Sequence, residues 1–334
     1  MTPSLVCVSN ADSGDISILR ATADGHLTVL PGIALGGVLM PMATNQDGSR
    51  LYVARRSEPF AVLTLAVDKA SGSLRLLGET PLPASMAYIA TDRHARHLLA
   101  ASYPGHMLTV SPIADDGTVG PVLQTIPTGP HAHAIVAAPS NRHVLATSLG
   151  ADEVLQFHFD ARSGRLTPND PPCWRQREGA GPRHLCFHPN GRFVYLLNEL
   201  DATLDVLSFD ADAGTLRWLQ TEATAPPGLN GKPWAADLHI TPDGRHLFTC
   251  ERHSSTLCAF AIDGSSGRVR RIGRTDTEQQ PRGFAIGPEG RTLLVAGQAS
   301  HHLSSYSLDP LTGELTLRQR EPVGRNPNWV LFLP

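Results

Sequence analysis

The chain has 334 residues, of which 41% are hydrophobic and 18% charged, and its net charge is -3 with histidine neutral. This composition is ordinary for a globular protein with a large core, and the scattered arginines exclude the basic tail or cluster of a nucleic-acid-binding protein. The N-terminus lacks the charged and apolar regions of a signal peptide, and no run approaches the ~20 apolar residues of a membrane helix, so we expect a cytoplasmic protein without a membrane or nucleic-acid partner.

The cysteines and histidines form no metal-binding pattern. Five cysteines make an odd set without CxxC spacing, and three of them, Cys7, Cys186 and Cys250, lie in apolar runs, so we expect buried free thiols. His131 and His133 share one strand face, but no carboxylate or thiolate stands at ligand spacing from them. We therefore expect no metal site.

A short turn signal recurs along the whole chain. It reads ATADGHL, KASGSL, ADDGTV, ARSGRL, ADAGTL, GSSGRV and LTGEL, and its glycines stand at positions 25, 72, 117, 164, 214, 267 and 313. The intervals between these glycines, 45 to 53 residues, indicate seven copies of one structural unit with small insertions.

A second turn signal runs in phase with the first, as NQDGSRLYV, DRHARHLLA, PSNRHVLAT, PNGRFVYLL, PDGRHLFTC and PEGRTLLVA. Each unit of ~45 residues thus contains two tight turns that join short strands, and no amphipathic helix of useful length. Four strands per unit are typical of a propeller blade. We predict an all-β fold, a seven-bladed β-propeller with four antiparallel strands per blade, in a single domain over residues 1–334.

The second turn signal occurs six times, whereas the first occurs seven times. One blade therefore lacks its inner hairpin turn, and this predicts how the ring closes. In this scheme the C-terminal NWVLFLP supplies the inner strand of a blade whose other three strands come from residues 4–30. Pairing of the two chain ends removes the open edge of the sheet. We expect residues 331–334, or their neighbours, to lie beside residues 5–9.

The register of the inner hairpins places polar residues together. The turn residues of these hairpins are Gly48, Ala95, Asn141, Gly191, Gly244 and Gly290. Residues eight positions before and eight after each turn lie opposite each other, at one mouth of the central channel. The ring before the turns contains Met40, Ala87, His133, Arg183, Ala236 and Arg282. The ring after them contains Arg56, Tyr103, Leu149, Glu199, Arg252 and Gln298.

The charges in these two rings favour a functional site. A lone arginine or glutamate at a strand end is usually a solvated cap. Several arginines at symmetry-related positions need another explanation, because like charges repel one another unless an anion binds them. In contrast, we expect His184 and His239 to be structural histidines, and Trp234 and Trp329 to be packing residues.

The stretches HAHAIVAAP, GAGPRHLCFHPNGRFVYLLNELDATLDVLSFD, WAADLHITPDGRHLFTCERHSSTLCAF and QPRGFAIGPEGRTLLVAGQASHHLSSY resemble the lactonase family of seven-bladed propellers. The similarity covers essentially the whole chain, and its most specific motif is GPRH, whose arginine is followed sixteen residues later by the glutamate of NEL. By this resemblance the family's catalytic His, Arg, Glu and Arg correspond to His133, Arg183, Glu199 and Arg252. The chain departs from the family at residues 148–150, where Ser-Leu-Gly replaces the frequent Asp-Leu-Gly.

The resemblance implies a lactone hydrolase that acts on 6-phospho-D-glucono-1,5-lactone in the pentose phosphate pathway, without a metal or cofactor. An arginine beside the carbonyl would stabilise the oxyanion of the tetrahedral intermediate. Glu199 is the first choice of general base, although the neighbouring Arg183 is expected to lower its pKa. His133 is nearly as good a choice, because the usual pKa of histidine lies closer to neutrality.

Five further residues are expected to bind the substrate. They are Arg56, Arg282, Gln298, Asp237 and His301. The number of arginines favours a phosphorylated lactone, because a phosphate monoester carries close to two charges and several acceptor oxygens. Two other interpretations stay open: a cycloisomerase that acts on a carboxy-muconate-like dicarboxylate, and a non-catalytic propeller that binds a protein. The oligomeric state is not predicted.

Overall fold

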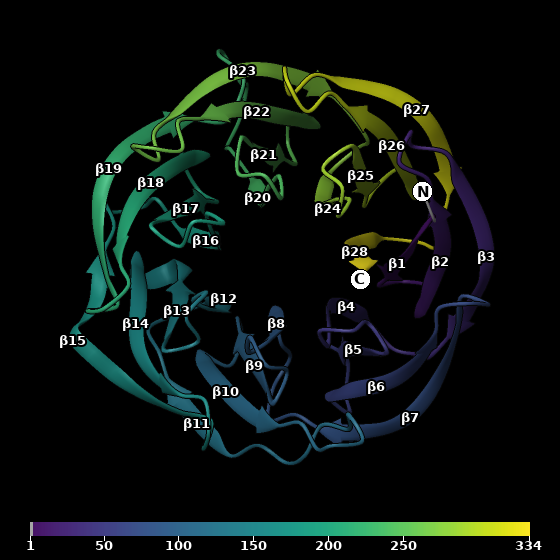
Figure 1. Cartoon of the computed structure of the whole chain (residues 1–334), viewed down its shortest axis with the longest axis horizontal. Coiled ribbons are helices and arrows are strands. Elements are labelled where there is room, and N and C mark those ends of the chain that lie inside the picture. Colours follow the sequence, from purple (N-terminus) through teal and green to yellow (C-terminus); the bar gives the residue numbers. More distant parts are fainter. Residues whose placement is uncertain (1–2) are drawn as a thin grey trace.

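The two turn signals of each repeat form the hairpins of a four-stranded antiparallel sheet. The computed structural model describes residues 3–334, and Figure 1 shows their seven sheets as a ring of blades around one axis. In each blade the chain runs from the strand nearest the axis outward to the rim, except that the innermost strand of blade 1 comes from the C-terminus. The predicted seven-bladed all-β fold is confirmed.

The first three blades are formed by residues 4–127 together with the C-terminal strand. From the axis outward, blade 1 contains β28 (Pro327–Leu333), β1 (Ser4–Asn10), β2 (Asp15–Ala21) and β3 (Leu27–Ala34). Blade 2 contains β4 (Leu39–Thr44), β5 (Arg50–Arg55), β6 (Ala61–Asp68) and β7 (Ser73–Pro81). Blade 3 contains β8 (Tyr88–Thr91), β9 (His97–Ser102), β10 (Met107–Pro112) and β11 (Gln124–Pro127).

The remaining blades follow the same order. Blade 4 contains β12 (Ala132–Ala137), β13 (His143–Ser148), β14 (Glu153–Asp160) and β15 (Arg165–Arg175). Blade 5 contains β16 (Pro182–Phe187), β17 (Phe193–Asn198), β18 (Thr203–Asp210) and β19 (Thr215–Ala223). Blade 6 contains β20 (Ala235–Ile240), β21 (His246–Glu251), β22 (Thr256–Ile262) and β23 (Val269–Asp276). Blade 7 contains β24 (Pro281–Ile286), β25 (Thr292–Gly297), β26 (His302–Leu308) and β27 (Leu315–Pro322).

The hydrophobic core is divided into wedges, one between each pair of neighbouring blades. In the wedge between blades 5 and 6, for example, Leu197 of β17 packs in one cluster with Phe260 of β22, and both side chains are fully buried. Because each sheet contributes one face to each of two wedges, every blade is stabilised by both neighbours. This arrangement holds the inner strands in fixed positions around the axis.

The glycines of the first turn signal join the third and fourth strands of the blades. All seven have a φ between 70° and 93°, where residues with a Cβ are strained. At Gly214 a Cβ would also lie 2.2 Å from Cδ2 of His143 in the neighbouring blade. Glycine is therefore required at position 214 for two reasons: the positive φ of the backbone and the close contact with the neighbouring blade.

The ring closes through the two ends of the chain. Strand β28 pairs antiparallel with β1, so that Leu331 lies opposite Cys7 and Leu333 lies opposite Leu5. Strands β28 and β1 lie side by side at the inner edge of blade 1 in Figure 1, and Val330 of β28 is buried in the wedge between blades 1 and 7. The closure predicted from the unequal number of turn signals is confirmed.

Removal of residues 327–334 is expected to lower the melting temperature by about 10 °C or more, because the truncation removes an inner strand and leaves β1 as an open edge. Differential scanning calorimetry measures the effect. The control is Leu311→Ala, at a side chain that is 77% exposed, which should leave the melting curve unchanged. A truncated chain that melts like the intact protein would contradict closure as a source of stability.

Helical structure in residues 3–334 is limited to one 3-10 turn, η1 (Leu149–Ala151), directly after β13. Leu149 is buried there, so this member of the second ring contributes an apolar side chain to the protein interior.

Within the described residues, no helix has the length and apolar character needed to span a bilayer. The five cysteines are free thiols, and three of them, Cys7, Cys250 and Cys258, are buried.

Candidate active site

β-Bulges at one end of the inner strands determine which side chains point into the channel. Arg183 is the extra residue of the β16–β17 hairpin, where the register shifts between Pro182 and His184. His133 and Arg282 are the extra residues at the matching bulges of blades 4 and 7. A bulge re-aims a side chain and is frequent beside functional sites. The repeated bulge therefore explains why these positions face one another across the channel.

These bulges open onto a cleft of about 320 Å³ at one mouth of the channel. The residues that line it are Arg56, Ala87, Tyr103, His133, Arg183, Glu199, Trp234, Arg252 and Arg282. The structure thus brings together six of the nine predicted site residues, which come from five different blades. Repeat register alone had placed all six at this mouth.

The other three predicted residues do not line the cleft. Gln298 donates a hydrogen bond from Nε2 to Oδ1 of Asn326 at 2.7 Å, and Nδ1 of His301 accepts one from the backbone N–H of Asn326 at 3.1 Å. Both side chains therefore hold the loop that leads into β28. Asp237 faces away from the cleft, because it lines a second cavity at the opposite mouth, where it contacts His184.

Glu199 is held by two arginines at the floor of the cleft. Its Oε2 atom lies 2.7 Å from Nε of Arg183 and 2.9 Å from Nη2 of Arg252, and both arginine side chains are only 2% exposed. Burial raises the pKa of Glu199, but the two guanidinium groups outweigh burial and lower it below its usual value. Glu199 is therefore a firmly ionised carboxylate that positions the arginines.

Arg56 and Arg282 have no carboxylate partner among the described residues. Arg56 donates to Oγ of Ser85 at 2.9 Å, and both guanidinium groups contact Sδ of Met40, at 2.9 and 3.3 Å. Burial and the neighbouring arginines lower the pKa of Arg282 well below its usual value. With four guanidinium groups and one carboxylate, the cleft carries an excess of positive charge that a bound anion would offset.

His133 lies beside these charges without a hydrogen-bond partner. It is 4% exposed, and neither of its ring nitrogens has a partner among residues 3–334. Burial, together with Arg183, His184, Arg282 and Arg252, lowers the pKa of His133 well below 6.5. The imidazole is therefore neutral at neutral pH, and its lone pair is available to a ligand.

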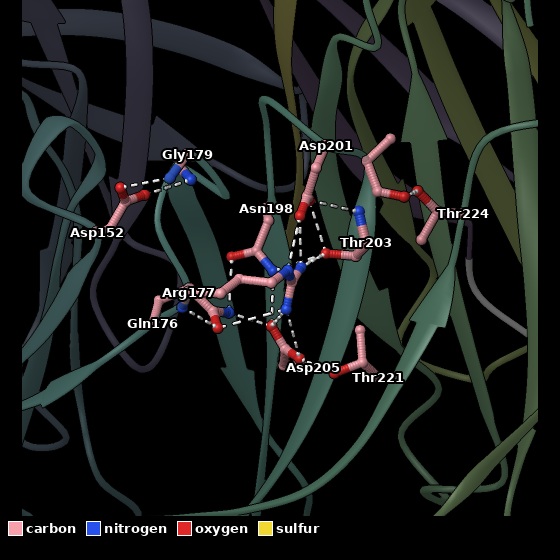
Figure 2. Close-up of polar contacts among 12 residues, drawn as sticks. Asp152, Gln176, Arg177, Gly179, Asn198, Asp201, Thr203, Asp205, Thr221 and Thr224 are labelled. Atoms are coloured by element: carbon pink, nitrogen blue, oxygen red, sulfur yellow. Dashed lines mark hydrogen bonds and ion pairs between the residues drawn. The ribbon is translucent and has the colours of Figure 1, made fainter.

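A polar network holds the segment that carries Arg183 and Glu199 into the site (Figure 2). Asp152 accepts hydrogen bonds from the backbone N–H groups of Gly179 and Gly181, at 2.7 and 2.8 Å, just before β16 begins. The fully buried Asp205 accepts from Nδ2 of Asn198 at 2.6 Å, and Arg177 bridges Asp205 to Asp201 in the turn between β17 and β18. Both ends of the β16–β17 hairpin are thereby fixed at the mouth of the channel.

The model of the family described as "Lactonase, 7-bladed beta-propeller" matches residues 5–332 of this chain. The chain belongs to this lactonase family. The resemblance drawn from the GPRH and NEL motifs is thus confirmed, and the match spans all seven blades of the lactonase.

Curated relatives match the lactonase over nearly its full length. The 6-phosphogluconolactonase of Serratia proteamaculans is 38% identical over 331 residues, which is 98% of each chain. The 6-phosphogluconolactonase of Pectobacterium carotovorum is 38% identical over 329 residues, again 98% of each. Among solved structures, the periplasmic gluconolactonase PpgL of Pseudomonas aeruginosa superposes with a TM-score of 0.93 at 29% identity and covers 99% of both chains.

Two aromatic residues of the lactonase cleft were not predicted as site residues. The Tyr103 ring stacks on His131, with ring centroids 4.1 Å apart, and the Trp234 ring lies 3.8 Å from Cζ of Arg252. Both rings line the cleft and offer it flat apolar surfaces. Tyr103 stands in the second ring of the repeat register, so the same signal that selected Arg252 could have selected it. Trp234 precedes β20 and carries no repeat signal.

Proposed function

We propose that the chain is a 6-phosphogluconolactonase, which hydrolyses 6-phospho-D-glucono-1,5-lactone to 6-phosphogluconate. The observation that carries the proposal is the pair of half-buried arginines, Arg56 and Arg282, whose guanidinium groups have no acidic partner among the described residues of the cleft. A phosphate monoester supplies the missing negative charge and several acceptor oxygens. The relatives named 6-phosphogluconolactonase, 36–38% identical over nearly the full chain, support the same substrate.

The reaction needs no group beyond the side chains of the cleft and a water molecule. His133 takes a proton from water as the water oxygen bonds to the lactone carbonyl carbon, and the carbonyl oxygen becomes an oxyanion. Arg183 stabilises this oxyanion by hydrogen bonding, with Arg252 beside it. When the carbonyl reforms, the bond to the ring oxygen breaks, and His133 returns the proton to that oxygen. The product is the open-chain acid, with the phosphate held by Arg56 and Arg282.

The choice of His133 as general base reverses the preference for Glu199 drawn from the sequence. Glu199 already accepts from Arg183 and Arg252, and these contacts lower its pKa, so it is a weak base. The pKa of His133 is also lowered, partly by the arginines around it. A bound phosphate offsets part of that positive charge, so substrate binding itself raises the basicity of His133.

A panel of three substrates tests the proposal. Acid release above the spontaneous rate is measured for 6-phosphogluconolactone and for glucono-1,5-lactone, and ring closure is followed on a carboxy-muconate. We expect the phosphorylated lactone to be turned over best. Preference for the carboxy-muconate would establish the cycloisomerase alternative, and no turnover of any compound would favour a propeller that binds a protein.

The pH dependence of hydrolysis tests the role of His133. With unphosphorylated glucono-1,5-lactone, kcat/KM is expected to stay level as the pH falls to 6.5, because the depressed pKa keeps the free imidazole neutral there, and to fall only at more acid pH. The unphosphorylated substrate avoids the titration of the phosphate group itself, whose second pKa is about 6. His133→Gln should remove this acid limb. A midpoint at or above 6.5 would show that another group is the base.

The cytoplasmic location expected from the sequence is part of this proposal. A phosphorylated sugar is charged and does not cross a bilayer unaided, so its hydrolase must share the compartment in which it is made. The gluconolactonase of Pseudomonas aeruginosa, in contrast, is described as periplasmic. Cell fractionation distinguishes the two, and recovery of the protein with periplasmic markers would contradict the proposal.

A further inference from the structure

His184 follows Arg183 in the GPRH motif and contacts it from below the cleft. Its Nε2 atom lies 3.1 Å from Nη1 of Arg183, and its Nδ1 atom lies 2.8 Å from Oδ1 of Asp237. His184 is 4% exposed and Asp237 9% exposed. A chain of three buried side chains thus runs from Asp237, at the opposite mouth of the channel, to Arg183 at the floor of the cleft.

The donors and acceptors of this chain allow one arrangement of hydrogens. Arg183 can only donate, so Nε2 of His184 must accept. The ionised carboxylate of Asp237 can only accept, so Nδ1 of His184 must carry the hydrogen. Burial and the adjacent Arg183 lower the pKa of His184 to about 4, so the ring is neutral, as this arrangement requires. Asp237 therefore selects the one tautomer of His184 that can accept from Arg183.

The remaining contacts of Arg183 leave one nitrogen for the substrate. Its Nε donates to Glu199 at 2.7 Å, and its Nη1 also donates to the carbonyl oxygen of Ala236. Nη2 has no hydrogen-bond partner among residues 3–334, and Arg183 lines the cleft. The guanidinium plane is thus fixed by its contacts at Nε and Nη1, and Nη2 is the nitrogen left to donate to a ligand in the cleft.

We propose that His184 and Asp237 are positioning residues, which hold the Arg183 guanidinium in the orientation that stabilises the oxyanion. This inference rests on the proposed lactonase function. Neither residue lines the cleft; both line the cavity of about 480 Å³ at the opposite mouth. They act on the reaction through Arg183, to which His184 is hydrogen-bonded, while the contact of the His184 ring with His133 is an edge-to-face packing contact with ring centroids 5.0 Å apart. The predicted substrate-binding role of Asp237 is replaced by this positioning role.

Asp237→Asn tests the proposal with almost no change in shape. The amide of the asparagine can donate to Nδ1 of His184 and so stabilise the tautomer with its hydrogen on Nε2. In that tautomer an N–H of His184 would point at the N–H donor of Arg183, and the hydrogen bond would be lost. We expect kcat to fall by about 10- to 100-fold, the range found for residues that orient a catalytic group, while KM changes by less than about threefold. The matched control is His239→Gln. His239 contacts the other oxygen of Asp237 at 3.1 Å but does not touch Arg183, so this variant should keep the wild-type kcat.

A double-mutant cycle separates positioning from general damage. In an Arg183→Lys variant the planar guanidinium group that His184 orients is absent. Adding Asp237→Asn to this variant should therefore change kcat by less than about twofold. An equal loss in both backgrounds would overturn the proposal, and so would an Asp237→Asn enzyme with wild-type kcat. Melting temperatures of all variants show whether each protein is folded.

Nitrogen-15 NMR of the imidazole reads the tautomer without reference to activity. We expect the hydrogen of His184 on Nδ1 in the wild-type protein and a shift toward Nε2 in Asp237→Asn. A wild-type His184 with its hydrogen on Nε2 would overturn the proposal, because that nitrogen could not accept from Arg183. Failure of the wild-type protein to hydrolyse any lactone would instead overturn the proposed function, and the tautomer would still decide whether Asp237 controls His184.

Discussion

Replacing Arg183 with alanine is expected to lower kcat/KM for 6-phosphogluconolactone by about 10²- to 10³-fold, which is the effect of removing one donor to an oxyanion. The loss should lie mainly in kcat, because the contact is made to charge that develops only in the transition state. The substitution should not unfold the protein, although Arg183 is 2% exposed. Glu199 keeps its second partner, Arg252, at 2.9 Å, so no buried carboxylate is left unpaired.

Steady-state kinetics and the melting temperature of the purified variant check this result together. Arg245→Ala is a suitable control, because the Arg245 side chain is 64% exposed on the turn between β20 and β21, outside the cleft. It removes the same charge from the protein and should leave both kinetic constants unchanged. A folded Arg183→Ala enzyme with the activity of wild type would show that the lactone carbonyl binds elsewhere.

Arg282→Met is expected to remove the preference for a phosphorylated substrate. In the wild-type enzyme, kcat/KM for 6-phosphogluconolactone should exceed that for glucono-1,5-lactone by about 10²-fold, or ~3 kcal/mol of charge-assisted hydrogen bonding. The substitution should lower the value for the phosphorylated lactone by about 10- to 100-fold and change that for glucono-1,5-lactone by less than about threefold. Measuring both substrates with one enzyme preparation makes each the control for the other.

The stability of Arg282→Met gives a second check that does not depend on turnover. Arg282 is a half-buried cation without an acidic partner among the described residues, and its Nη2 donates to the sulfur of Met40. Replacing it with an apolar side chain of similar length should leave the melting temperature unchanged or raise it. A large fall in melting temperature, or equal kinetic losses on both lactones, would contradict a phosphate-binding role. High ionic strength should reduce the ratio of kcat/KM for 6-phosphogluconolactone to that for glucono-1,5-lactone in the wild-type enzyme.

Most of the fold could be predicted because the same local rules act seven times. The turn glycines repeat at a constant interval, and one of them, Gly214, shows why: its backbone and its distance from His143 both exclude a side chain. The same periodicity predicted the cleft, since His133, Arg183 and Arg282 occupy equivalent positions of three inner strands. Repeat register is therefore a strong predictor of which strand ends meet.

Contacts between blades could not be predicted in this way. Register placed Gln298 at the mouth of the channel, but its side chain turns aside to bind Asn326, which belongs to the loop before β28. The contact between His184 and Asp237 joins residues 53 positions apart on two different inner strands. Such contacts depend on the angle between neighbouring sheets and on the bulges, which local sequence patterns do not encode.

The pairing of β28 with β1 also determines when the protein can finish folding during synthesis. The first strand leaves the ribosome early, but its partner follows all the other described strands in the chain, so the edge of β1 stays unpaired until β28 has been synthesised. The wedges between blades 1 and 2 and between blades 1 and 7 both include β28 side chains and remain incomplete for the same time. The nascent chain therefore carries an unpaired strand edge until β28 emerges, and prolonged pausing before that point would favour aggregation.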